Sequence, residues 1–333
     1  MFFSPYKTMF FLTLLSGTVL SISSSSWLLA WIGLELNLMS FIPLISSKTN
    51  LISSEAALKY FLVQALGSAI IVLASSMLSV STEFASLAIS LALLLKMGAS
   101  PFHFWFPQVM EGMNWLQATL LMTIQKLAPM FLISYLTFSV FCWTTIAIAA
   151  SFSAIVGAIG GLNQTSLRKI LAFSSINHMS WMLFSMLINE TSWFIYFMLY
   201  SLITMSVTML FFSFQAYYFS NLINAQCPTL SKTISMMALF SLGGLPPFSG
   251  FIPKWIVVQE MISHSYFHIL ILLLFSSLIT LYFYIRLSIS SVTLSHPQNK
   301  WAKDYSRDTS FSKIIFYFLN LFGLLVPSLL FIL

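Results

Sequence analysis

Four ionisable residues lie deep within long apolar stretches of a chain that carries few other internal charges: Glu35, Lys96, Lys126 and Lys254. A charge at bilayer depth costs at least ~2.5–3.5 kcal/mol on insertion scales, so such a residue usually faces a bundle interior or a water-filled path. Lysine suits proton transfer, because burial disfavours its charged form and a nearby carboxylate restores it. These residue types therefore favour the movement of protons or other ions.

Two of the lysines flank predicted helix breaks. Lys96 opens the run Lys-Met-Gly-Ala-Ser-Pro (96–101), and Lys254 follows Gly-Gly-Leu-Pro-Pro-Phe-Ser-Gly (243–250). A pair of interrupted spans in corresponding positions of two halves is typical of a transport site built from inverted repeats. The alternative is a pair of packing kinks, since glycine and proline are common in transmembrane helices.

Other polar side chains offer weaker candidates. His103 follows the first break and His178 lies in Ser-Ser-Ile-Asn-His-Met; an unperturbed pKa near 6.5 suits a relay, but a hydrogen-bonded packing histidine fits each equally well. Glu35 has a structural alternative, a carboxylate bonded to Asn37, to Ser40 or to a neighbouring hydroxyl. We expect a simple surface ion pair for Glu55 and Lys59, which are four residues apart. The aromatic residues at 193, 196 and 200 are interpreted as interface belts and packing.

The composition indicates a membrane protein. Hydrophobic residues make up 59% of the 333 residues and charged residues only 7%, whereas roughly a quarter of a soluble domain is charged. The net charge of +6 does not indicate nucleic-acid binding, because no basic patch with interleaved aromatic residues is present. Cys142 and Cys227 lack metal-ligand spacing and are expected to be ordinary cysteines.

About 20 apolar residues cross a bilayer as a helix, and on that criterion the sequence predicts an all-α polytopic membrane protein with eleven spans. The predicted spans are 8–22, 27–46, 55–79, 84–112 (broken), 114–137, 140–162, 167–187, 191–220, 232–262 (broken), 265–291 and 311–331. We expect a single membrane domain over residues 1–333, in which half-repeats at about 27–137 and 140–291 precede a C-terminal helix at 311–331.

The lysines and arginines outside the buried set all fall on one side of these spans. Glu83, Glu190 and Glu260 reach the other side, which receives no lysine or arginine. The positive-inside rule then places the N-terminus in the cytoplasm or matrix and the C-terminus on the opposite side. The cations on the first side are Lys7, Lys48, Lys59, Arg168, Lys169, Lys232, Arg286, Lys300, Lys303, Arg307 and Lys313. We expect a retained first helix rather than a cleaved signal peptide, and a loop at 295–310 that is either solvated or docks another subunit.

Six blocks of sequence, in order from residue 31 to residue 255, resemble one known family. They are Trp-Ile-Gly-Leu-Glu-Leu-Asn-Leu-Met-Ser-Phe-Ile-Pro (31–43), Glu-Ala-Ala-Leu-Lys-Tyr-Phe (55–61), Lys-Met-Gly-Ala-Ser-Pro-Phe-His-Phe-Trp (96–105), Gln-Lys-Leu-Ala-Pro (125–129), Leu-Arg-Lys-Ile-Leu-Ala-Phe-Ser-Ser-Ile-Asn-His-Met (167–179) and Leu-Gly-Gly-Leu-Pro-Pro-Phe-Ser-Gly-Phe-Ile-Pro-Lys-Trp (242–255). Together they resemble the antiporter-like membrane subunits of mitochondrial NADH dehydrogenase, respiratory complex I. The last block favours the subunit 2 branch, because some sister subunits carry a glutamate where Lys254 stands. The family's bacterial relatives have three more N-terminal helices, so the chain resembles the shortened animal form.

The resemblance implies a proton-translocating subunit of the complex I membrane arm, in the multi-pass setting of the mitochondrial inner membrane with its N-terminus in the matrix. Its implied partners are other membrane-arm subunits, including neighbouring antiporter-like ones, and lipids. It also implies a relay in which Glu35 pairs with Lys96, Lys126 is central and Lys254 hands protons onward. In the family FMN, iron–sulfur clusters and ubiquinone chemistry belong to other subunits. We therefore expect a part of a translocase with no redox centre or cofactor of its own, and the sequence contains no cysteine cluster or dinucleotide-binding fingerprint.

Two other functions remain open on the sequence. A stand-alone cation/proton antiporter would share the same core but work without redox subunits. A structural spacer would join pumping modules without moving protons, although the buried lysines argue against it.

Overall fold

The computed structural model describes residues 5–47, 50–224 and 229–293. Within those ranges every regular element is a helix, and the only strand-like pairing is an isolated bridge between Ser166 and Tyr218. The all-α prediction is therefore confirmed for the described residues. Contacts divide the chain into two compact units, residues 1–156 and 157–333, which are described separately.

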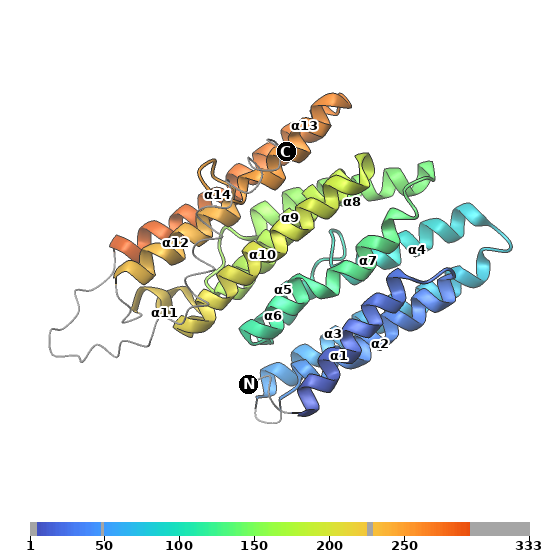
Figure 1. The fold of residues 1–333 in the computed structure, drawn as a ribbon, viewed down its shortest axis with the longest axis horizontal. Coiled ribbons are helices and arrows are strands. Elements are labelled where there is room, and N and C mark those ends of the chain that lie inside the picture. Colours follow the sequence, from blue (N-terminus) through green and yellow to red (C-terminus); the bar gives the residue numbers. More distant parts are fainter. Residues whose placement is uncertain (1–4, 48–49, 225–228, 294–333) are drawn as a thin grey trace, which may run out of the picture. The chain divides into compact units, whose positions relative to one another are not determined.

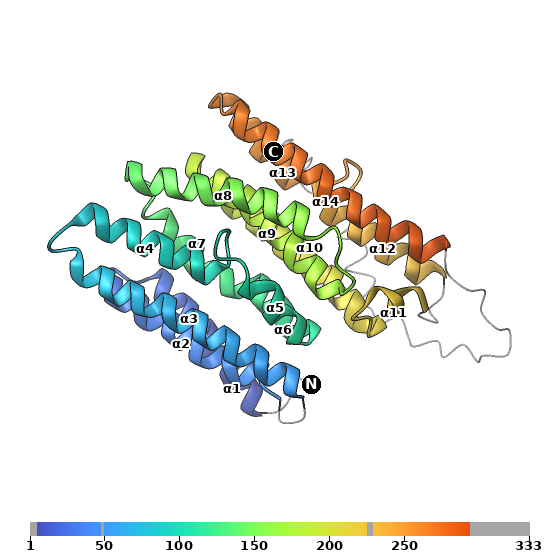
Figure 2. The same cartoon turned by 180° about the vertical axis from the view of Figure 1, so that it is seen from behind.

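The first unit is a bundle of helices in which α1, α2 and α3 lie side by side (Figures 1 and 2). Its helices are α1 (Pro5–Ile22), α2 (Trp27–Ile45), α3 (Leu51–Met77), α4 (Thr82–Met97), α5 (Trp105–Gly112), α6 (Trp115–Met122), α7 (Ile124–Ser134) and most of α8 (Val140–Gly160). Helix α3 packs against α2, α4 and α5, while α7 packs against α1 and α4. Helix α3 is thus the common neighbour of the elements on both sides of the first break.

The second unit is organised around α9, most of whose side chains are buried. Its helices are α9 (Leu167–Ile188), α10 (Glu190–Phe214), α11 (Phe219–Asn224), α12 (Thr229–Gly243), α13 (Phe251–Ser263) and α14 (Phe267–Thr293). Helix α9 packs against α10, α13 and α14, and α12 packs against α10 and α14. Burial all round α9 explains why its sequence combines apolar residues with many small serines.

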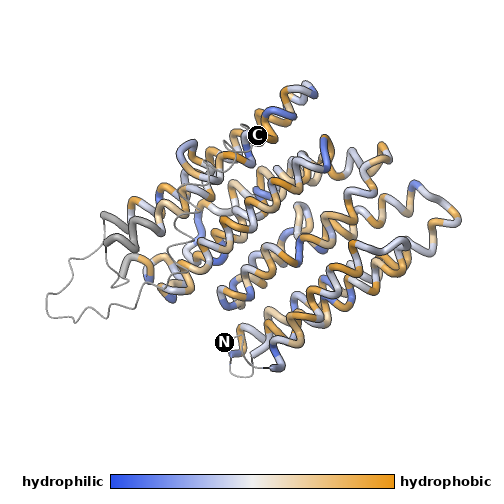
Figure 3. The backbone as a smooth tube through the Cα atoms, viewed as in Figure 1, coloured by the Kyte–Doolittle hydropathy of each residue, from blue (hydrophilic) through white to orange (hydrophobic). Residues whose placement is uncertain are grey.

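Seven of the described helical segments are long and apolar enough to cross a membrane. Hydrophobic residues recur along the whole length of the helices (Figure 3), and large apolar side chains such as Leu62 and Phe275 are more than half exposed. Lipid would cover such faces in a membrane protein. Ten predicted spans coincide with described helices or pairs of helices, while the eleventh, 311–331, lies outside the described residues. The count of eleven crossings stays a prediction.

The two predicted helix breaks are confirmed, and they share one ending. Helix α4 stops at Gly98 with φ 73°, and α12 stops at Gly244 with φ 78°. At both breaks, the backbone amide of the glycine donates a hydrogen bond to the backbone carbonyl three residues earlier, with a nitrogen–oxygen distance of 3.1 Å. The next amide donates to the carbonyl five residues before it, at 3.1 Å in the first break and 3.3 Å in the second. This is the Schellman ending, which needs a residue that tolerates the left-handed conformation.

The links that follow the two glycines are also alike. Residues 98–104 separate α4 from α5, and residues 244–250 separate α12 from α13, so each link has seven residues. Both links follow the pattern Gly-x-x-Pro-Phe, at 98–102 and 244–248. Proline has no amide hydrogen to continue a helix, so Pro101 and Pro247 stand at equivalent points of non-helical backbone. This short sequence repeat is visible only when the two breaks are aligned on their glycines.

A third interruption was not predicted. The segment expected as one continuous helix at 114–137 is divided into α6 and α7 by Thr123, whose φ of −114° and ψ of −82° are not helical. The Thr123 hydroxyl donates to the carbonyl of Thr119 at 2.7 Å, and the amide of Lys126 donates to Thr123 at 3.1 Å. The predicted span is confirmed, because Trp115–Ser134 is long and apolar enough to cross a membrane. The interruption within it carries no glycine or proline signal, since the threonine side chain satisfies the local backbone.

Helices α1 and α2 approach closely at two glycines. A Cβ atom added at Gly17 would lie 2.9 Å from the amide nitrogen of Asn37, and one at Gly33 would lie 2.6 Å from the amide nitrogen of Ser21. Small residues allow such backbone contact between membrane helices. This contact fixes the part of α2 that carries Glu35.

We predict that Gly250→Ala destabilises the second break. An alanine Cβ there would overlap the carbonyl oxygen of Ser241, whereas at Gly243 the nearest atom would be 3.6 Å away. Overpacking of this kind costs about 1–3 kcal/mol or more. Thermal unfolding of the purified assembled protein should show a lower Tm for Gly250→Ala and little change for the control Gly243→Ala. Equal melting temperatures for the two variants would contradict the tight packing at Gly250.

Candidate functional site

The predicted residues divide between the two units. Glu35 lies on α2, Lys96 in the last turn of α4 and Lys126 in the first turn of α7, all in the first unit. Lys254 lies near the start of α13 in the second unit. These three lysines are all of the buried lysines in the described ranges, and each is within a few residues of a helix interruption.

Glu35 is partly buried, and one of its carboxylate oxygens, Oε2, is enclosed without a hydrogen-bond partner. Among the described residues no salt bridge joins it to Lys96. The pairing of Glu35 with Lys96 that the resemblance implies stays a prediction. No hydrogen bond from Asn37 or Ser40 to Glu35 is formed among the described residues: the Asn37 amide oxygen accepts from Gln125, and the Ser40 hydroxyl donates to the Asn37 carbonyl. Glu35 is thus available for a proton or a water molecule.

Lys96 is only 6% exposed, and its side chain passes over a glycine of α3. A Cβ atom at Gly67 would lie 3.0 Å from Lys96 Cγ, so the missing side chain makes room for the lysine stem. The Gln64 amide donates to the Lys96 carbonyl at 3.0 Å. The last turn of a helix also carries partial negative charge, which favours a cation. The break in α4 therefore creates a place where an ammonium group is tolerated.

Lys126 is 2% exposed and lies just after the Thr123 interruption. Its ammonium nitrogen lies 5.0 Å from the ring centroid of Phe106, within the range of a cation–π contact. Phe106 itself belongs to α5, directly after the first break. The segment that follows the first break thus supplies the aromatic face for Lys126, the lysine that follows the Thr123 interruption.

Lys254 is 7% exposed and reaches back across its own break. Its ammonium donates to the carbonyl of Gly243, the last residue of α12, at 2.8 Å, and lies 5.9 Å from the Trp181 ring centroid. A Cβ atom at Gly244 would lie 2.9 Å from Lys254 Cδ, so the glycine also leaves space for the side chain. Lys254 therefore caps the C-terminal end of α12, one of the carbonyl-rich ends that a helix leaves unpaired.

The two histidines have different surroundings. His103 is buried in the first link, 3.5 Å from the Ser100 hydroxyl and against the ring of Phe104. The His178 Nδ1 lies 2.9 Å from the Tyr196 hydroxyl, and its ring packs on Tyr200 at 5.0 Å.

The aromatic residues near His178 correct another expectation. Trp193, Tyr196 and Tyr200 are all at most 2% exposed, so the interface-belt interpretation was wrong and the packing interpretation is confirmed. A cavity of about 10 Å³ lies between His178, these tyrosines and the second break, near Gly250 and Pro253. That is about the room one water molecule needs. The cavity brings the histidine close to the link that precedes Lys254.

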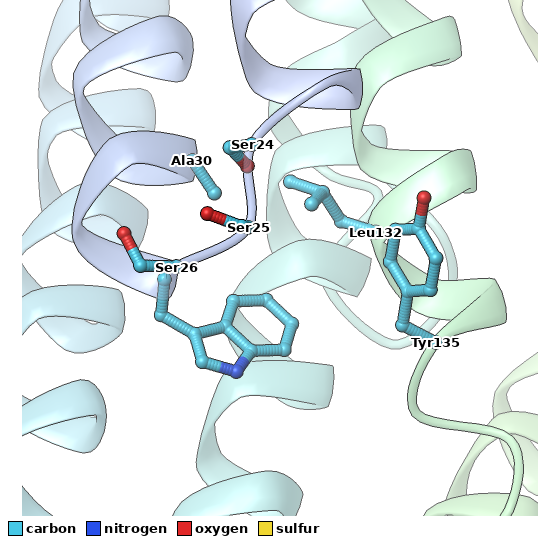
Figure 4. A pocket seen from close by; sticks show the side chains of 7 residues that line it. Ser24, Ser25, Ser26, Ala30, Leu132 and Tyr135 are labelled. Carbon is cyan, nitrogen blue, oxygen red and sulfur yellow. The ribbon is translucent and has the colours of Figure 1, made fainter.

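A larger cavity lies away from all of these residues. It has a volume of about 330 Å³ and opens where the α1–α2 turn faces the C-terminal end of α7 (Figure 4). It is lined by Ser24, Ser25, Ser26, Trp27, Ala30, Leu132 and Tyr135. None of the candidate ionisable residues lines it, so it is not the chemical centre.

The remaining predictions have mixed outcomes. Glu55 and Lys59 form the expected surface ion pair at 2.7 Å. Cys142 is buried and free, and the described ranges hold no group of three His, Cys, Asp or Glu side chains placed to bind a metal. Cys227, His296 and the loop at 295–310 lie outside the described residues.

The sequence reasoning missed a buried network beside Lys126. The Tyr60 hydroxyl donates to Gln125 Oε1 at 3.1 Å, and Gln125 Nε2 donates to Asn37 Oδ1 at 2.8 Å. One signal could have revealed it: Tyr60, Gln64 and Gly67 are spaced by four and three residues, which places them on one face of α3.

Comparison with known proteins gives a consistent set of similarities. The family described as NADH:quinone oxidoreductase/Mrp antiporter, TM, matches residues 24–87 and 77–280. A relative from Anopheles gambiae, named NADH-ubiquinone oxidoreductase chain 2, is 44% identical over 98% of both chains.

Two solved structures share the fold. One is in respiratory complex I from Thermus thermophilus with bound aureothin, with a TM-score of 0.81 and 23% identity, covering 97% of this chain and 78% of that one. The other is in the Mrp complex from Dietzia, with a TM-score of 0.77 and 16% identity, covering 87% of this chain and 61% of that one. At such identities the likeness concerns the fold alone.

We predict that Lys254→Met loosens the end of α12. Removal of the ammonium leaves the Gly243 carbonyl without this donor, at a cost of about 1–3 kcal/mol for a buried acceptor. Hydrogen exchange of the Gly244 and Leu245 amides in the assembled protein should become faster. Lys254→Arg keeps a donor and should show a smaller change. Unchanged exchange in Lys254→Met would reject the capping role.

Proposed function

The chain belongs to the NADH:quinone oxidoreductase/Mrp antiporter transmembrane family, and on that premise we propose that it is a proton-translocating subunit of NADH-ubiquinone oxidoreductase, respiratory complex I. The observation that carries the proposal is the placement of Lys96, Lys126 and Lys254, each buried beside a helix interruption. Interrupted helices at membrane depth are tolerated only where they are enclosed by protein or line water. Ionisable groups at such points are suited to passing protons.

The setting follows from the named relatives. The protein works in the mitochondrial inner membrane, among other membrane-arm subunits that include neighbouring antiporter-like ones, and in contact with lipid. Its N-terminus faces the matrix and its C-terminus the intermembrane space, as the one-sided distribution of lysine and arginine supports. NADH oxidation and ubiquinone reduction take place in other subunits, which hold FMN and iron–sulfur clusters, and this chain holds no cofactor.

In the first unit, Glu35 and Lys96 begin the relay. In this relay the Glu35 carboxylate stabilises a proton on Lys96, because a nearby negative charge favours the ammonium form. Protonation or movement of Glu35 removes that stabilisation, so Lys96 releases its proton toward Lys126. Lys126 receives it against the Phe106 ring, whose π face stabilises the ammonium.

In the second unit, Lys254 is the exit residue. It holds its proton while donating to the Gly243 carbonyl and releases it when that contact opens. His178, beside the small cavity at this break, is a candidate carrier for the same step. His103 is the corresponding, weaker candidate at the first break.

The two breaks are counterparts in an inverted repeat. The shared Gly-x-x-Pro-Phe links and their shared hydrogen bonds support this relation. The half-repeats cover about 27–137 and 140–291. Lys96 precedes its break and Lys254 follows the other, yet each cation lies at the C-terminal end of the first half-helix. Transporters built from inverted repeats use such half-helix ends to hold cations.

A stand-alone cation/proton antiporter is the alternative, favoured by the likeness to a chain of the Mrp complex. Purification from native membranes separates the two functions. Co-migration with flavin and iron–sulfur subunits supports the complex I assignment, and proton exchange by the isolated chain would support the antiporter.

We predict that Glu35→Gln leaves assembly nearly intact and reduces proton pumping. The amide keeps the size of the side chain but carries no charge to act on Lys96. Proton uptake per NADH oxidised, measured in vesicles with matched amounts of assembled complex, should fall. Normal pumping would remove Glu35 from the mechanism.

We predict that both Lys126→Arg and Lys126→Met impair proton-coupled ubiquinone reduction. Arginine keeps a cation but cannot deprotonate in a protein, while methionine keeps much of the apolar stem without the charge. Turnover of the assembled complex is the measurement. Recovery of activity by arginine alone would show that Lys126 is a fixed counter-charge and not a relay.

A further inference from the structure

Three side chains from three helices form a hydrogen-bonded chain next to Lys126. Tyr60 of α3 donates to Gln125 of α7 at 3.1 Å, and Gln125 donates to Asn37 of α2 at 2.8 Å. Tyr60 and Asn37 are 2% and 3% exposed, and Gln125 is partly buried. In this Tyr60–Gln125–Asn37 network, each hydrogen bond joins a donor on one side chain to an acceptor on the next. Fully paired polar networks in a low-dielectric interior are rigid, because any broken bond leaves an unpaired group.

The first turn of α7 depends on this network for its position. Thr123 interrupts the helix before Gln125, and the Lys126 amide donates to the Thr123 carbonyl, only three residues earlier, in place of the usual bond to the residue four positions before it. Pro129 has no amide hydrogen, so the Gln125 carbonyl also lacks its normal helical donor. A turn that carries Lys126 is thus weakly held by its own backbone. The Gln125 side chain ties that turn to α2 and α3.

Tyr60 is itself held firmly. Its ring lies 5.2 Å from that of Phe41 on α2 and 5.9 Å from that of Trp105 at the start of α5. The Trp105 indole donates to the Leu95 carbonyl at 3.1 Å, in the last turn of α4. The Tyr60 hydroxyl, which donates to Gln125, is therefore held in place by contacts that involve both α4 and α5, the helices on the two sides of the first break.

The same face of α3 also holds Lys96. Gln64, one turn after Tyr60, donates to the Lys96 carbonyl, and Gly67, about one turn further, makes room for the Lys96 stem. One helical face thus sets the positions of both lysines of the first unit.

We propose that Gln125 and Tyr60 are positioning residues for proton transfer through Lys126. Gln125 fixes the turn that carries the lysine, and Tyr60 ties that turn to the helix face that holds Lys96. The inference rests on the proposed function, because it assigns these residues to the same relay. It adds two uncharged side chains, which neither gain nor lose a proton, to the residues on which pumping depends.

The test uses Gln125→Met and Tyr60→Phe in the assembled complex. Methionine keeps the length of the glutamine without its hydrogen bonds, and phenylalanine removes only the hydroxyl, so the ring contacts remain. Loss of one net hydrogen bond at the relay corresponds to about a fivefold change. We expect Gln125→Met to lower proton pumping several-fold at an unchanged amount of complex, and to lower the number of protons moved per NADH oxidised. Tyr60→Phe should also lower proton pumping and the number of protons per NADH, but to a smaller extent. In the double variant Tyr60→Phe should cause no loss beyond that of Gln125→Met, because the hydroxyl acts through Gln125.

Gln117→Met is the matched control. Gln117 also makes two hydrogen bonds, accepting from the Asn114 amide and donating to the Leu44 carbonyl, but it lies in α6 and away from the lysines. It should lower stability without changing the number of protons per NADH. If Gln125→Met and Tyr60→Phe keep the wild-type ratio as Gln117→Met does, the positioning role is rejected.

Two further measurements keep the outcomes distinct. If Gln125→Met fails to assemble, Tyr60→Phe decides alone, since it retains the packing. Lys126→Met is measured in parallel: normal pumping in that variant overturns the proposed function itself. Lost pumping in Lys126→Met with normal pumping in Tyr60→Phe overturns only the inference about positioning.

Discussion

A charged group enclosed in a membrane protein must find its partners within the protein, because hydrocarbon offers none. The described part of this chain meets that constraint by interrupting helices where lysines are buried. A helix end presents unpaired carbonyls and partial negative charge, and Lys254 uses both when it donates to Gly243. Lys96 lies in the last turn of α4, where the same field applies. Lys126 instead has an aromatic face, that of Phe106. The breaks are thus what makes buried cations tolerable.

The two glycine-terminated breaks close the preceding helix in the same way. Gly98 and Gly244 adopt the left-handed conformation, close the preceding helix with the same pair of hydrogen bonds and lead into links of equal length. Gly244 has a second role, because the absence of a side chain there leaves room for the stem of Lys254. At the first break the room for Lys96 comes from Gly67 on another helix. Backbone closure is shared between the breaks, while accommodation of the lysine is specific to each.

Not every polar group in the first unit is satisfied. Glu35 Oε2 is enclosed without a partner, and so is the Trp31 indole nitrogen one helical turn earlier. In the nearby Tyr60–Gln125–Asn37 network, hydrogen bonds link the three side chains. An unpaired carboxylate oxygen is costly, but it is also free to accept a proton or a water molecule. The contrast separates an unpaired carboxylate oxygen from hydrogen-bonded side chains that hold the helices in place.

The sequence by itself determined the helical membrane class, the positions of two breaks and the identity of the buried lysines. Those features follow from local composition: apolar runs of spanning length, glycine and proline signals, and charges too costly to leave in lipid. Only the tertiary structure decided the partner of each charge. The Gln125–Asn37 bond joins residues 88 apart, and no local pattern specifies such a contact. The same limit applies to Thr123, which interrupts a helix through a side-chain hydrogen bond that composition does not reveal.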